Sequence, residues 1–580
     1  MAVNAGGVVA IVLFYLVIVA IGVWAAWKHK YKTSHAELRR NEVIMIGRRD
    51  IGLLLGIFTM TATWVGGAYI NGTAEAVYTV RQGLAWTQAP VGYALSLVLG
   101  GIFFAKPMRS RKYVTMLDPF QERYGRRIGG LLFIPAAMGE MFWTASVLSA
   151  LGSSLSVIFE ISFHVAIIIS SLIAIFYTLI GGLYSVAYTD MAQLLCIFIG
   201  LYISLPFANT HPAVTSIATT ATQYIDREPW LGNIPSATAW IWVDNCILTI
   251  CGGLPWQAYF QRVLSSSSAR KAQIFSFVAA FNTLILAIPS VIIGAIGAST
   301  DWNQTSYGLP TPAERNVTQM ILPIVLRYLC PSYISFFGLG AVSAAVMSSA
   351  DSSILSASSM FTRNIYHYVF RREAADNELV WVMRLSIVMF GGTATGMTWL
   401  STSVYGLWYL SSDLIFVLLF PQLVSVFYIK GSNAYGSITG YILGLFMRIG
   451  GGEPYINLDP WICYGRCYLD TSFPNGPRYV QAFPFKTITM LSSFLVNLSI
   501  SYLTKYLFIN GVLPRKLDFL GSFASETKTN KIGFLTNDNT GSFEQIPSDK
   551  EPVDPLDTTS QNKEPVVDEV STPVISKTDD

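Results

Sequence analysis

Two tryptophans lie deep within apolar segments, each beside a pair of glycines: Thr63-Trp64-Val65-Gly66-Gly67 and Gly252-Gly253-Leu254-Pro255-Trp256. Tryptophan in a membrane protein normally collects at the boundary between lipid and water. Glycine and proline in a spanning helix release backbone groups, which then need partners or a water-lined cavity. Two interrupted helices in corresponding halves of a transporter point to its binding site. An aromatic ring at each break indicates a cationic ligand, because the ring face attracts positive charge.

A quaternary ammonium group suits such a site, because it has no N–H to donate and is held best by ring faces. Each face contributes about 0.5–2 kcal/mol, depending on how far the site excludes water. Trp143 is a further interior tryptophan, and Trp408 precedes the polar pair Ser411-Ser412. Core packing is the alternative interpretation for any one of these residues. Their joint placement at helix breaks favours a site.

Residues 344–353 place several serine hydroxyls and the carboxylate of Asp351 in one apolar segment. A hard monovalent cation such as Na⁺ needs oxygen ligands, which hydroxyls and freed carbonyls supply without many buried charges. Close helix packing is the alternative, since small residues associate well in lipid. Asp351 favours the ion site, because a carboxylate inside a membrane is costly and marks a functional position.

Further acidic residues lie in or near apolar segments: Glu75, Glu140, Asp190, Asp244, Asp413 and Glu453. For each of them we expect a structural partner, either a hydroxyl or a freed backbone N–H. Asp244 lies near a predicted helix end and is a candidate for solvation.

The elements that position these residues are predicted to be membrane-spanning helices. Hydrophobic residues make up 52% of the chain and charged residues 13%, well below the roughly 25% of soluble proteins. We therefore predict an all-α polytopic membrane protein. Its thirteen candidate spans lie at about 8–28, 51–79, 84–105, 130–155, 163–182, 190–208, 241–261, 274–298, 333–360, 379–400, 405–428, 434–450 and 485–508.

Basic residues concentrate in the loops at 28–49 and 106–127 and in the loops on the same side as these. The positive-inside rule then places the N-terminus outside and the C-terminus in the cytoplasm. The sequons at Asn303 and Asn316 fall in a loop on the outer side, whereas Asn71 and Asn497 fall in apolar segments. Residues 521–580 are polar and acidic, which predicts a disordered cytoplasmic tail.

Cys463 and Cys467 share a polar loop, where a disulfide forms if that loop is extracellular. No nucleotide-binding loop, dinucleotide fingerprint or zinc pattern is present, and no histidine falls within a predicted helix core. The chain is therefore not expected to be an enzyme or to bind nucleic acid.

Four stretches, at 58–67, 254–265, 338–353 and 404–413, closely resemble the choline-transporting members of the sodium/solute symporter family. The likeness runs from the first helix to about Asp518. It implies a leucine-transporter-type core of five helices and an inverted repeat of five, with one helix before and two after. The expected organisation is a first helix and basic loop at 1–50, repeats at 51–208 and 209–428, two C-terminal helices with an extracellular loop at 429–510, and the tail at 511–580.

The resemblance also implies an activity: choline uptake that is driven by Na⁺, requires Cl⁻ and is blocked by hemicholinium-3. The expected setting is the plasma membrane of the presynaptic terminal and the synaptic vesicle membrane, where choline supports acetylcholine synthesis. Membrane lipid, a possible homo-oligomer and trafficking partners of the tail complete the expected interactions. The alternatives are a sodium symporter of the same fold for another small organic solute, and a choline sensor that does not transport.

The resemblance further implies the site residues. The aromatic cage for choline corresponds to Trp64, Tyr93, Trp143, Trp256 and Trp408. The sodium ligands correspond to backbone carbonyls of Thr61 and Trp64, and to Ala345, Ser348 and Ser349, with Asp351 as a further acidic position. The glycosylated asparagine corresponds to Asn303.

Overall fold

The computed structural model describes residues 16–18, 20–22, 24–25, 40–80, 82–180, 182–224, 227–401, 403–470 and 477–523. Most of the predicted first span and basic loop, and the predicted tail from 524 onward, lie outside these residues. The described residues of the first span are helical.

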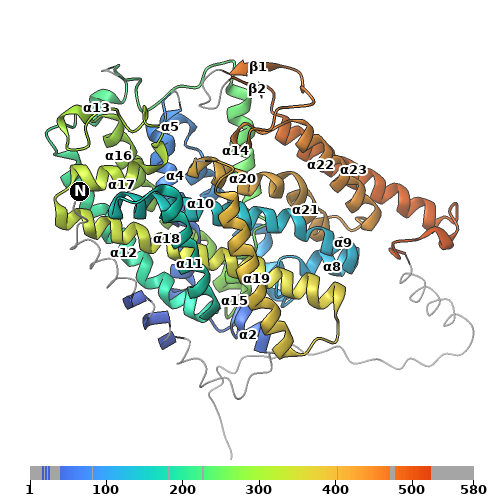
Figure 1. Cartoon of the computed structure of the whole chain (residues 1–580). Coiled ribbons are helices and arrows are strands. Elements are labelled where there is room, and N and C mark those ends of the chain that lie inside the picture. Colours follow the sequence, from blue (N-terminus) through green and yellow to red (C-terminus); the bar gives the residue numbers. More distant parts are fainter. Residues whose placement is uncertain are drawn as a thin grey trace, which may run out of the picture. The chain divides into compact units, whose positions relative to one another are not determined.

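Helices dominate the described chain (Figure 1). In order they are α2 (Arg40–Ile46), α3 (Leu53–Trp64), α4 (Gly67–Tyr78), α5 (Gly83–Trp86), α6 (Ala89–Leu99), α7 (Ala105–Ser110), α8 (Asp118–Tyr124), α9 (Arg126–Leu131), α10 (Phe133–Phe159), α11 (Phe163–Ile180), α12 (Leu183–Asn209), α13 (Ile217–Thr220), α14 (Ala239–Gly252), α15 (Gln257–Ser265), α16 (Ala269–Ala298), α17 (Ile321–Leu329), α18 (Ser332–Met360), α19 (Asp376–Met397), α20 (Val404–Leu414), α21 (Phe420–Tyr428), α22 (Ala434–Gly450) and α23 (Phe485–Ile509). Short π-helical segments at Gly100–Phe104, Phe361–Phe370 and Ile415–Leu419 continue α6, α18 and α20.

Every predicted span between 51 and 508 coincides with a helix or a broken pair of helices in the structure. Eight of the described helices are long and apolar enough to cross a bilayer, or nine if the bent pair α3–α4 counts as one span. The predicted spans at α11, at α14–α15 and at α22 coincide with shorter helices. The mostly helical fold with several membrane spans is confirmed, and the exact number of spans stays a prediction.

Both predicted interruptions are present. Helices α3 and α4 meet at an angle of 45°, and α14 and α15 are separated by residues 253–256. The start of α3 meets the end of α15, where Ile51 N–H donates to Ser265 O at 3.2 Å and Ser267 N–H donates to Ile51 O at 3.3 Å. Because α3 begins where α15 ends, the two broken helices run in opposite directions. Figure 1 shows α14 near the top of the view and α15 near the bottom.

Side-chain caps fix the starts of several helices. The Ser403 hydroxyl accepts from Gly406 N–H at 2.9 Å at the start of α20. The Asn433 amide oxygen accepts from Tyr435 N–H at 3.1 Å at the start of α22. Such caps satisfy N–H groups that have no partner inside the helix. They place the beginnings of these helices where the sequence carries serine or asparagine.

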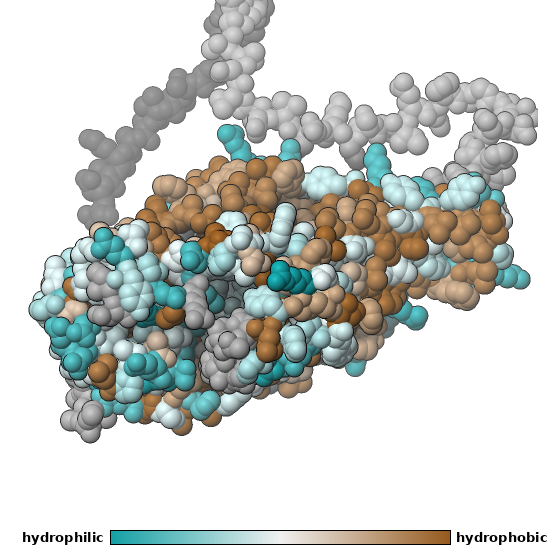
Figure 2. All heavy atoms as spheres, turned by 90° about the horizontal axis from the view of Figure 1, so that it is seen from above, coloured by the Kyte–Doolittle hydropathy of each residue, from teal (hydrophilic) through white to brown (hydrophobic). Residues whose placement is uncertain are grey.

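Figure 2 shows the face that carries the β-hairpin, on which polar and apolar side chains mix. Hydrophobic side chains cover one flank of this view and the end formed by α22 and α23. On α23, Leu495 and Leu503 are 60% and 50% exposed, and on α22 Phe446 is 60% exposed. An apolar outer surface of this kind is what contact with lipid requires. It agrees with the prediction of a membrane protein.

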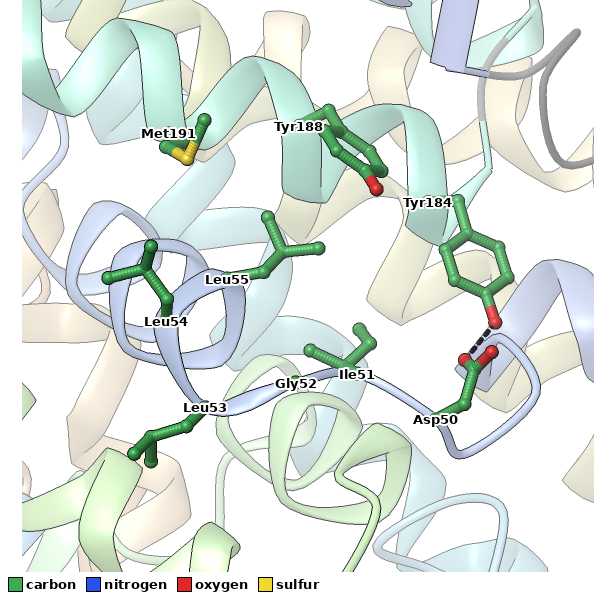
Figure 3. Close-up of a pocket in the computed structure, with 9 residues that line it drawn as sticks. All are labelled: Asp50, Ile51, Gly52, Leu53, Leu54, Leu55, Tyr184, Tyr188 and Met191. Atoms are coloured by element: carbon green, nitrogen blue, oxygen red, sulfur yellow. Dashed lines mark hydrogen bonds between the residues drawn. The ribbon is translucent and has the colours of Figure 1, made fainter.

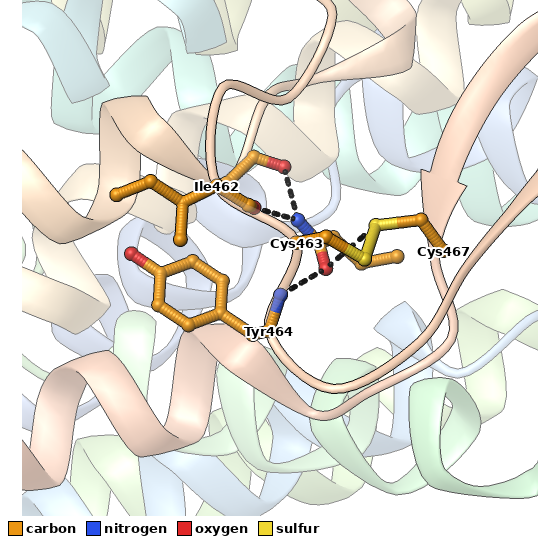
Figure 4. Close-up of a disulfide and its surroundings, with 6 residues drawn as sticks. Ile462, Cys463, Tyr464 and Cys467 are labelled. Atoms are coloured by element: carbon orange, nitrogen blue, oxygen red, sulfur yellow. Dashed lines mark hydrogen bonds between the residues drawn. A yellow bond between two sulfur atoms is a disulfide. The ribbon is translucent and has the colours of Figure 1, made fainter.

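Strands β1 (Cys467–Asp470) and β2 (Arg478–Gln481) form an antiparallel pair in which Cys467 lies opposite Gln481. Cys463 and Cys467 form a disulfide at the base of this hairpin (Figure 4). The bond that the sequence left open is therefore present.

Four buried charged side chains join α20 to the two C-terminal helices. Arg448 Nε donates to Asp413 Oδ1 at 2.8 Å, and its Nη2 lies 2.6 Å from Glu453 Oε2. Lys486 Nζ lies 3.4 Å from Asp413 Oδ2 and 3.2 Å from Glu453 Oε2. Two acids and two bases form a neutral cluster, which is why these charges can be buried together.

Asp244 differs from its prediction. It is buried, not solvated, because the first turn of α23 covers it. Its carboxylate accepts from Lys486 N–H at 3.0 Å and from Thr487 N–H at 2.7 Å. A carboxylate at a helix N-terminus satisfies N–H groups and the helix dipole, so Asp244 fixes α14 to α23.

The buried ion cluster generates a prediction about stability. Replacing Arg448 by leucine leaves Asp413 and Glu453 without their guanidinium partner, and breaking a buried ion pair in this way costs roughly 3–5 kcal/mol. We expect Arg448→Leu to lower the midpoint of thermal unfolding of the detergent-solubilised protein. Arg478→Ala is the control, because Arg478 pairs at 3.6 Å with Asp459, which is 62% exposed, and exposed pairs contribute about 1 kcal/mol or less. Equal midpoints for wild type and Arg448→Leu would contradict the assigned role.

Candidate substrate and ion site

The five aromatic residues predicted to form a cage come together in the structure. Trp64 ends α3, Trp256 immediately precedes α15, and the other three lie within α6, α10 and α20. Each is at most 5% exposed: Trp64, Tyr93, Trp143, Trp256 and Trp408. We call these five residues the aromatic cluster. Its members are up to 344 positions apart in the sequence (64 to 408), so only the fold brings them together.

The rings of the aromatic cluster are in direct contact. Trp256 meets Trp64 with ring centroids 5.2 Å apart and Trp143 at 5.4 Å, both edge to face. Tyr93 stacks on Trp408 at 5.3 Å, and Trp143 lies 6.0 Å from Trp408. These spacings are those of favourable aromatic pairs. The rings therefore form one continuous cluster.

The space inside the cluster is small. A cavity of about 10 Å³ is lined by Thr63, Trp64, Trp143, Trp256, Ala258 and Tyr259, which is about the volume needed by one water molecule. In this conformation the rings pack against one another. A quaternary ammonium group can bind among them only if the rings move apart.

Glycines at the two breaks allow this close packing. A Cβ on Gly67 would lie 1.9 Å from Val346 Cγ2 of α18, and a Cβ on Gly253 would lie 2.8 Å from Tyr93 Cδ1. Any larger residue would push α18 away from the α3–α4 break or Tyr93 away from Trp256. The glycines beside the two tryptophans thus set the distance between the elements that form the cluster.

Three tyrosines extend the cluster, and sequence reasoning missed them. Tyr69 and Tyr405 lie 5.3 and 5.6 Å from Trp408 between ring centroids, and Tyr259 lines the small cavity. Tyr405 is one helical turn from Trp408, a spacing that places both on one face of α20 and could have indicated it. Tyr93 OH is also hydrogen-bonded to Ser412 Oγ.

The residues predicted to bind sodium lie on two elements, the end of α3 and the middle of α18. Thr61 and Trp64 belong to the last turn of α3. The Thr61 carbonyl accepts from Val65 N–H at 2.8 Å. Ala345, Ser348, Ser349 and Asp351 belong to α18.

Ser348, Ser349 and Asp351 are buried on α18, and two of their oxygen atoms have no partner in the described part of the chain. Ser349 Oγ and Asp351 Oδ2 lack a hydrogen-bond partner among the described residues. Asp351 Oδ1 accepts from Thr178 Oγ1 at 3.1 Å. Unpartnered buried oxygens are costly for a protein, and they are the atoms that a small cation would use.

Asp190 joins the two elements, and its role was expected only to be structural. Its Oδ2 accepts from Thr59 Oγ1 of α3 at 2.5 Å, and its Oδ1 accepts from Ser348 Oγ of α18. Arg262 Nη2 lies 3.5 Å from Asp190 Oδ2, and both side chains are fully buried. Arg262 Nη2 also donates to Ser352 Oγ at 2.5 Å. This network holds α3, α12, α15 and α18 together beside the candidate sodium ligands.

Glu75 and Glu140 confirm the expectation of structural partners. Glu75 Oε2 accepts from Tyr405 N–H at 3.0 Å at the start of α20. Glu140 accepts from Ala258 N–H at 3.3 Å at the start of α15 and from Ser353 Oγ at 2.6 Å. Each carboxylate thus contacts the N-terminus of a helix next to a member of the aromatic cluster.

The segment before α8 is fixed to the same region. Met116 N–H donates to the Oε1 atom of Gln257, the residue directly after Trp256, at 2.8 Å. Nearby, Arg363 pairs with Asp118 at 3.3 Å and with Glu42 at 2.9 Å. Burial alone would raise the pKa of Asp118, but the charge of Arg363 and several hydrogen bonds outweigh it and hold this pKa below its usual value. An ionised Asp118 therefore joins the start of α8 to Arg363.

A larger cavity of about 470 Å³ lies at the start of α3, and no member of the aromatic cluster lines it (Figure 3). Residues 50–55 line one side, and Tyr184, Tyr188 and Met191 of α12 line the other. Tyr184 OH donates to Asp50 Oδ1 and accepts from Arg48 N–H at 2.8 Å. None of the predicted site residues lines this cavity.

The sequons occupy different environments. Asn303 and Asn316 are exposed, in the segment between α16 and α17. Asn71 and Asn497 are fully buried, as expected for sequons within apolar helices. Glycosylation of Asn303 stays a prediction.

Comparison with known proteins gives a consistent result. Residues 44–444 match the Sodium:solute symporter family. The chain is 66% identical over 526 residues to the high-affinity choline transporter 1 of Torpedo marmorata, covering 91% of this chain and 90% of the relative. It is 59% identical over 583 residues to the high affinity choline transporter 1 of Homo sapiens, covering 100% of both chains.

Among solved structures, a Na⁺-coupled sialic acid symporter in a substrate-bound, outward-open state is similar, with a TM-score of 0.66. It is 18% identical and covers 86% of this chain and 97% of that chain, so this likeness shows the fold alone. The relatives are transporters, which confirms that the chain is not an enzyme. The family match spans residues 44–444, and the two relatives are 59–66% identical over nearly their whole length. The chain therefore belongs to the sodium:solute symporter family.

Proposed function

We propose that this protein takes up choline together with Na⁺ across the plasma membrane by alternating access. The observation that carries the proposal is the aromatic cluster, in which five buried rings from five separate parts of the chain contact one another. The names of the two relatives, both high-affinity choline transporters, support the same substrate.

The chemistry of the cluster fits a quaternary ammonium ion. Choline cannot donate N–H hydrogen bonds, and each aromatic face contributes about 0.5–2 kcal/mol to holding its charge. The indole N–H groups of Trp64, Trp256 and Trp408 have no hydrogen-bond partner among the described residues. Such donors are available to the hydroxyl group of choline once the rings have moved apart.

Sodium coupling follows from the shared position of Trp64. Its carbonyl and that of Thr61 are the proposed α3 ligands, with Ala345, Ser348, Ser349 and Asp351 on α18. Sodium bound between α3 and α18 would fix the end of α3, and with it the ring of Trp64 in the aromatic cluster. Choline would then meet a site that is already ordered, which is positive coupling between two ligands.

Alternating access requires two halves that move relative to each other around a central site. We propose that residues 51–208 and 209–428 are inverted repeats of five helices each, within thirteen spanning helices. The opposite directions of the two broken helices, α3–α4 and α14–α15, support this arrangement. Because choline and Na⁺ are both cations, an inside-negative potential favours their entry by about 2.3 kcal/mol per charge per 100 mV.

The proposal also includes properties of transport and of the cellular setting. We propose that uptake depends on Cl⁻ and is blocked by hemicholinium-3, that the N-terminus is extracellular and the C-terminus cytoplasmic, and that Asn303 is glycosylated. We further propose residence in the presynaptic plasma membrane and synaptic vesicles, where choline supplies acetylcholine synthesis, a possible homo-oligomer, and trafficking partners for the tail. The similarity to choline transporters supports this setting.

The coupling is tested by uptake of radiolabelled choline into proteoliposomes. We expect uptake to require an inward Na⁺ gradient and to fall to background when Li⁺ or an organic cation replaces Na⁺. The control is the same vesicle preparation without protein. Uptake that continues undiminished without Na⁺ would rule out sodium coupling.

The aromatic cluster is tested by Trp256→Ala. Because Trp256 contacts Trp64, Tyr93 and Trp143, its loss removes a central ring, and we expect the KM for choline to rise about tenfold. Trp240→Ala is the matched control, since Trp240 lies on α14 and is 64% exposed; it should transport like wild type. Surface biotinylation separates a binding defect from poor expression. Wild-type affinity in Trp256→Ala would remove this residue from the site.

The proposed sodium ligand Ser349 is tested by Ser349→Ala. We expect the Na⁺ concentration for half-maximal uptake to rise several-fold, because a buried hydroxyl with no protein partner is lost. Ser358→Ala is the matched control, since Ser358 is buried on the same helix but donates to Ile354 O at 2.7 Å. An unchanged Na⁺ dependence in Ser349→Ala would count against its role as a ligand.

A further inference from the structure

The core between the aromatic cluster and α18 contains more buried acids than bases among the described residues. Glu140, Asp190 and Asp351 are each at most 1% exposed, and Arg262 is fully buried. Arg262 is engaged by Asp190 at 3.5 Å, by Ser352 and by Gln261. Glu140 and Asp351 form no ion pair with a described basic side chain, so the single charge of Arg262 cannot balance all three acids if they are ionised.

Asp351 belongs to the proposed sodium ligands, but the proposed function gives Glu140 no role. Glu140 lies one helical turn before Trp143 on α10, which places both side chains on the same face. Its Oε1 is 3.3 Å from Ala258 N, and Ala258 lines the small cavity with Trp64, Trp143 and Trp256. This carboxylate therefore lies directly behind the wall of the aromatic cluster.

The hydrogen bonds of Glu140 are those of an ionised carboxylate. Ser353 Oγ lies 2.6 Å from Oε2, a distance typical of a hydroxyl that donates to a charged oxygen. The N–H of Ala258 belongs to the first turn of α15, where the helix dipole also favours negative charge. Thr144 Oγ1 donates to Ser353 Oγ at 2.9 Å. This bond orients the Ser353 hydroxyl, which in turn donates to the Glu140 carboxylate. The charge is held in a rigid position by α10, α15 and α18.

We propose that Glu140 is a positioning residue that makes the site selective for cations: its charge attracts the ammonium group into the aromatic cluster without touching it. This inference rests on the proposed function, because it assumes that choline binds within the aromatic cluster. The rings provide faces for any apolar or cationic head group of the right size. The fixed negative charge behind them distinguishes a cation from a neutral molecule of the same shape.

Glu140→Gln tests this role, because glutamine keeps the size and one acceptor oxygen but removes the charge. The probe pair is choline and 3,3-dimethyl-1-butanol, which has the same shape with a neutral carbon in place of nitrogen. At roughly 8 Å and an effective dielectric constant of about 20, the loss of one charge should weaken choline binding by about tenfold or more. The inhibition constant of the neutral alcohol should change by less than about twofold.

Ser353→Ala is the matched control for structure, since it removes the short hydrogen bond to Glu140 and keeps the charge. A purely structural role of Glu140 predicts that Glu140→Gln and Ser353→Ala weaken both probes in the same ratio. That result, or wild-type choline affinity in Glu140→Gln, would overturn the proposal. Equilibrium binding of radiolabelled choline to whole membranes gives the measurement even if a variant does not reach the cell surface.

Glu140→Asp provides a second variant if Glu140→Gln does not fold. It retains the charge, so the preference for choline over the neutral alcohol should stay within about threefold of wild type, and its loss would contradict the proposal. Failure of the proposed function looks different. In that case the wild-type protein itself would not bind or take up choline. If only the role of Glu140 is wrong, the wild-type protein still binds choline, and Glu140→Gln does not weaken choline binding more than binding of the neutral alcohol.

Discussion

A helix that breaks inside a bilayer must find partners for the backbone groups that it releases, because lipid offers none. This constraint determines much of the structure around the two breaks. The break after Trp64 is packed against α18 through Gly67 and Val346, and the start of α15 is met by the carboxylate of Glu140. The second break is satisfied by a carboxylate from a distant part of the chain, whereas the first is packed against a distant helix and its backbone bonds are local. Both breaks lie beside tryptophans of the aromatic cluster.

Charge inside the membrane follows the same logic. Asp413, Arg448, Glu453 and Lys486 balance one another, and this balanced cluster joins the C-terminal helices to α20. Near α18 the balance is incomplete, since Arg262 is engaged by Asp190 while Asp351 retains an oxygen without a partner. A balanced cluster gives a permanent attachment. An unbalanced one leaves room for cations that arrive and depart, which is what transport of Na⁺ and choline requires under the proposed function.

The sequence predicted the helices and the two breaks well, because apolar runs and Gly-Gly pairs are local signals. It also predicted which aromatic residues lie in the interior, although the sharper assignment of Tyr93 and Trp408 depended on family resemblance. The partners of the buried acids could not be predicted, because they are set by tertiary packing: Thr59 and Asp190 are 131 positions apart. Asp244 was misjudged for the same reason. Its position near a helix end indicated solvent, but α23, which begins more than two hundred positions later, covers it.

The contact between Ile51 and residues 265–267 has a consequence for how this end of the protein can open. Two backbone hydrogen bonds, at 3.2 and 3.3 Å, tie the beginning of α3 to the end of α15. The two helices are thus joined at their ends as well as at the aromatic cluster. Neither can move away alone without breaking these bonds. An opening at this end must either move α3 and α15 together as one rigid body or begin by breaking both hydrogen bonds.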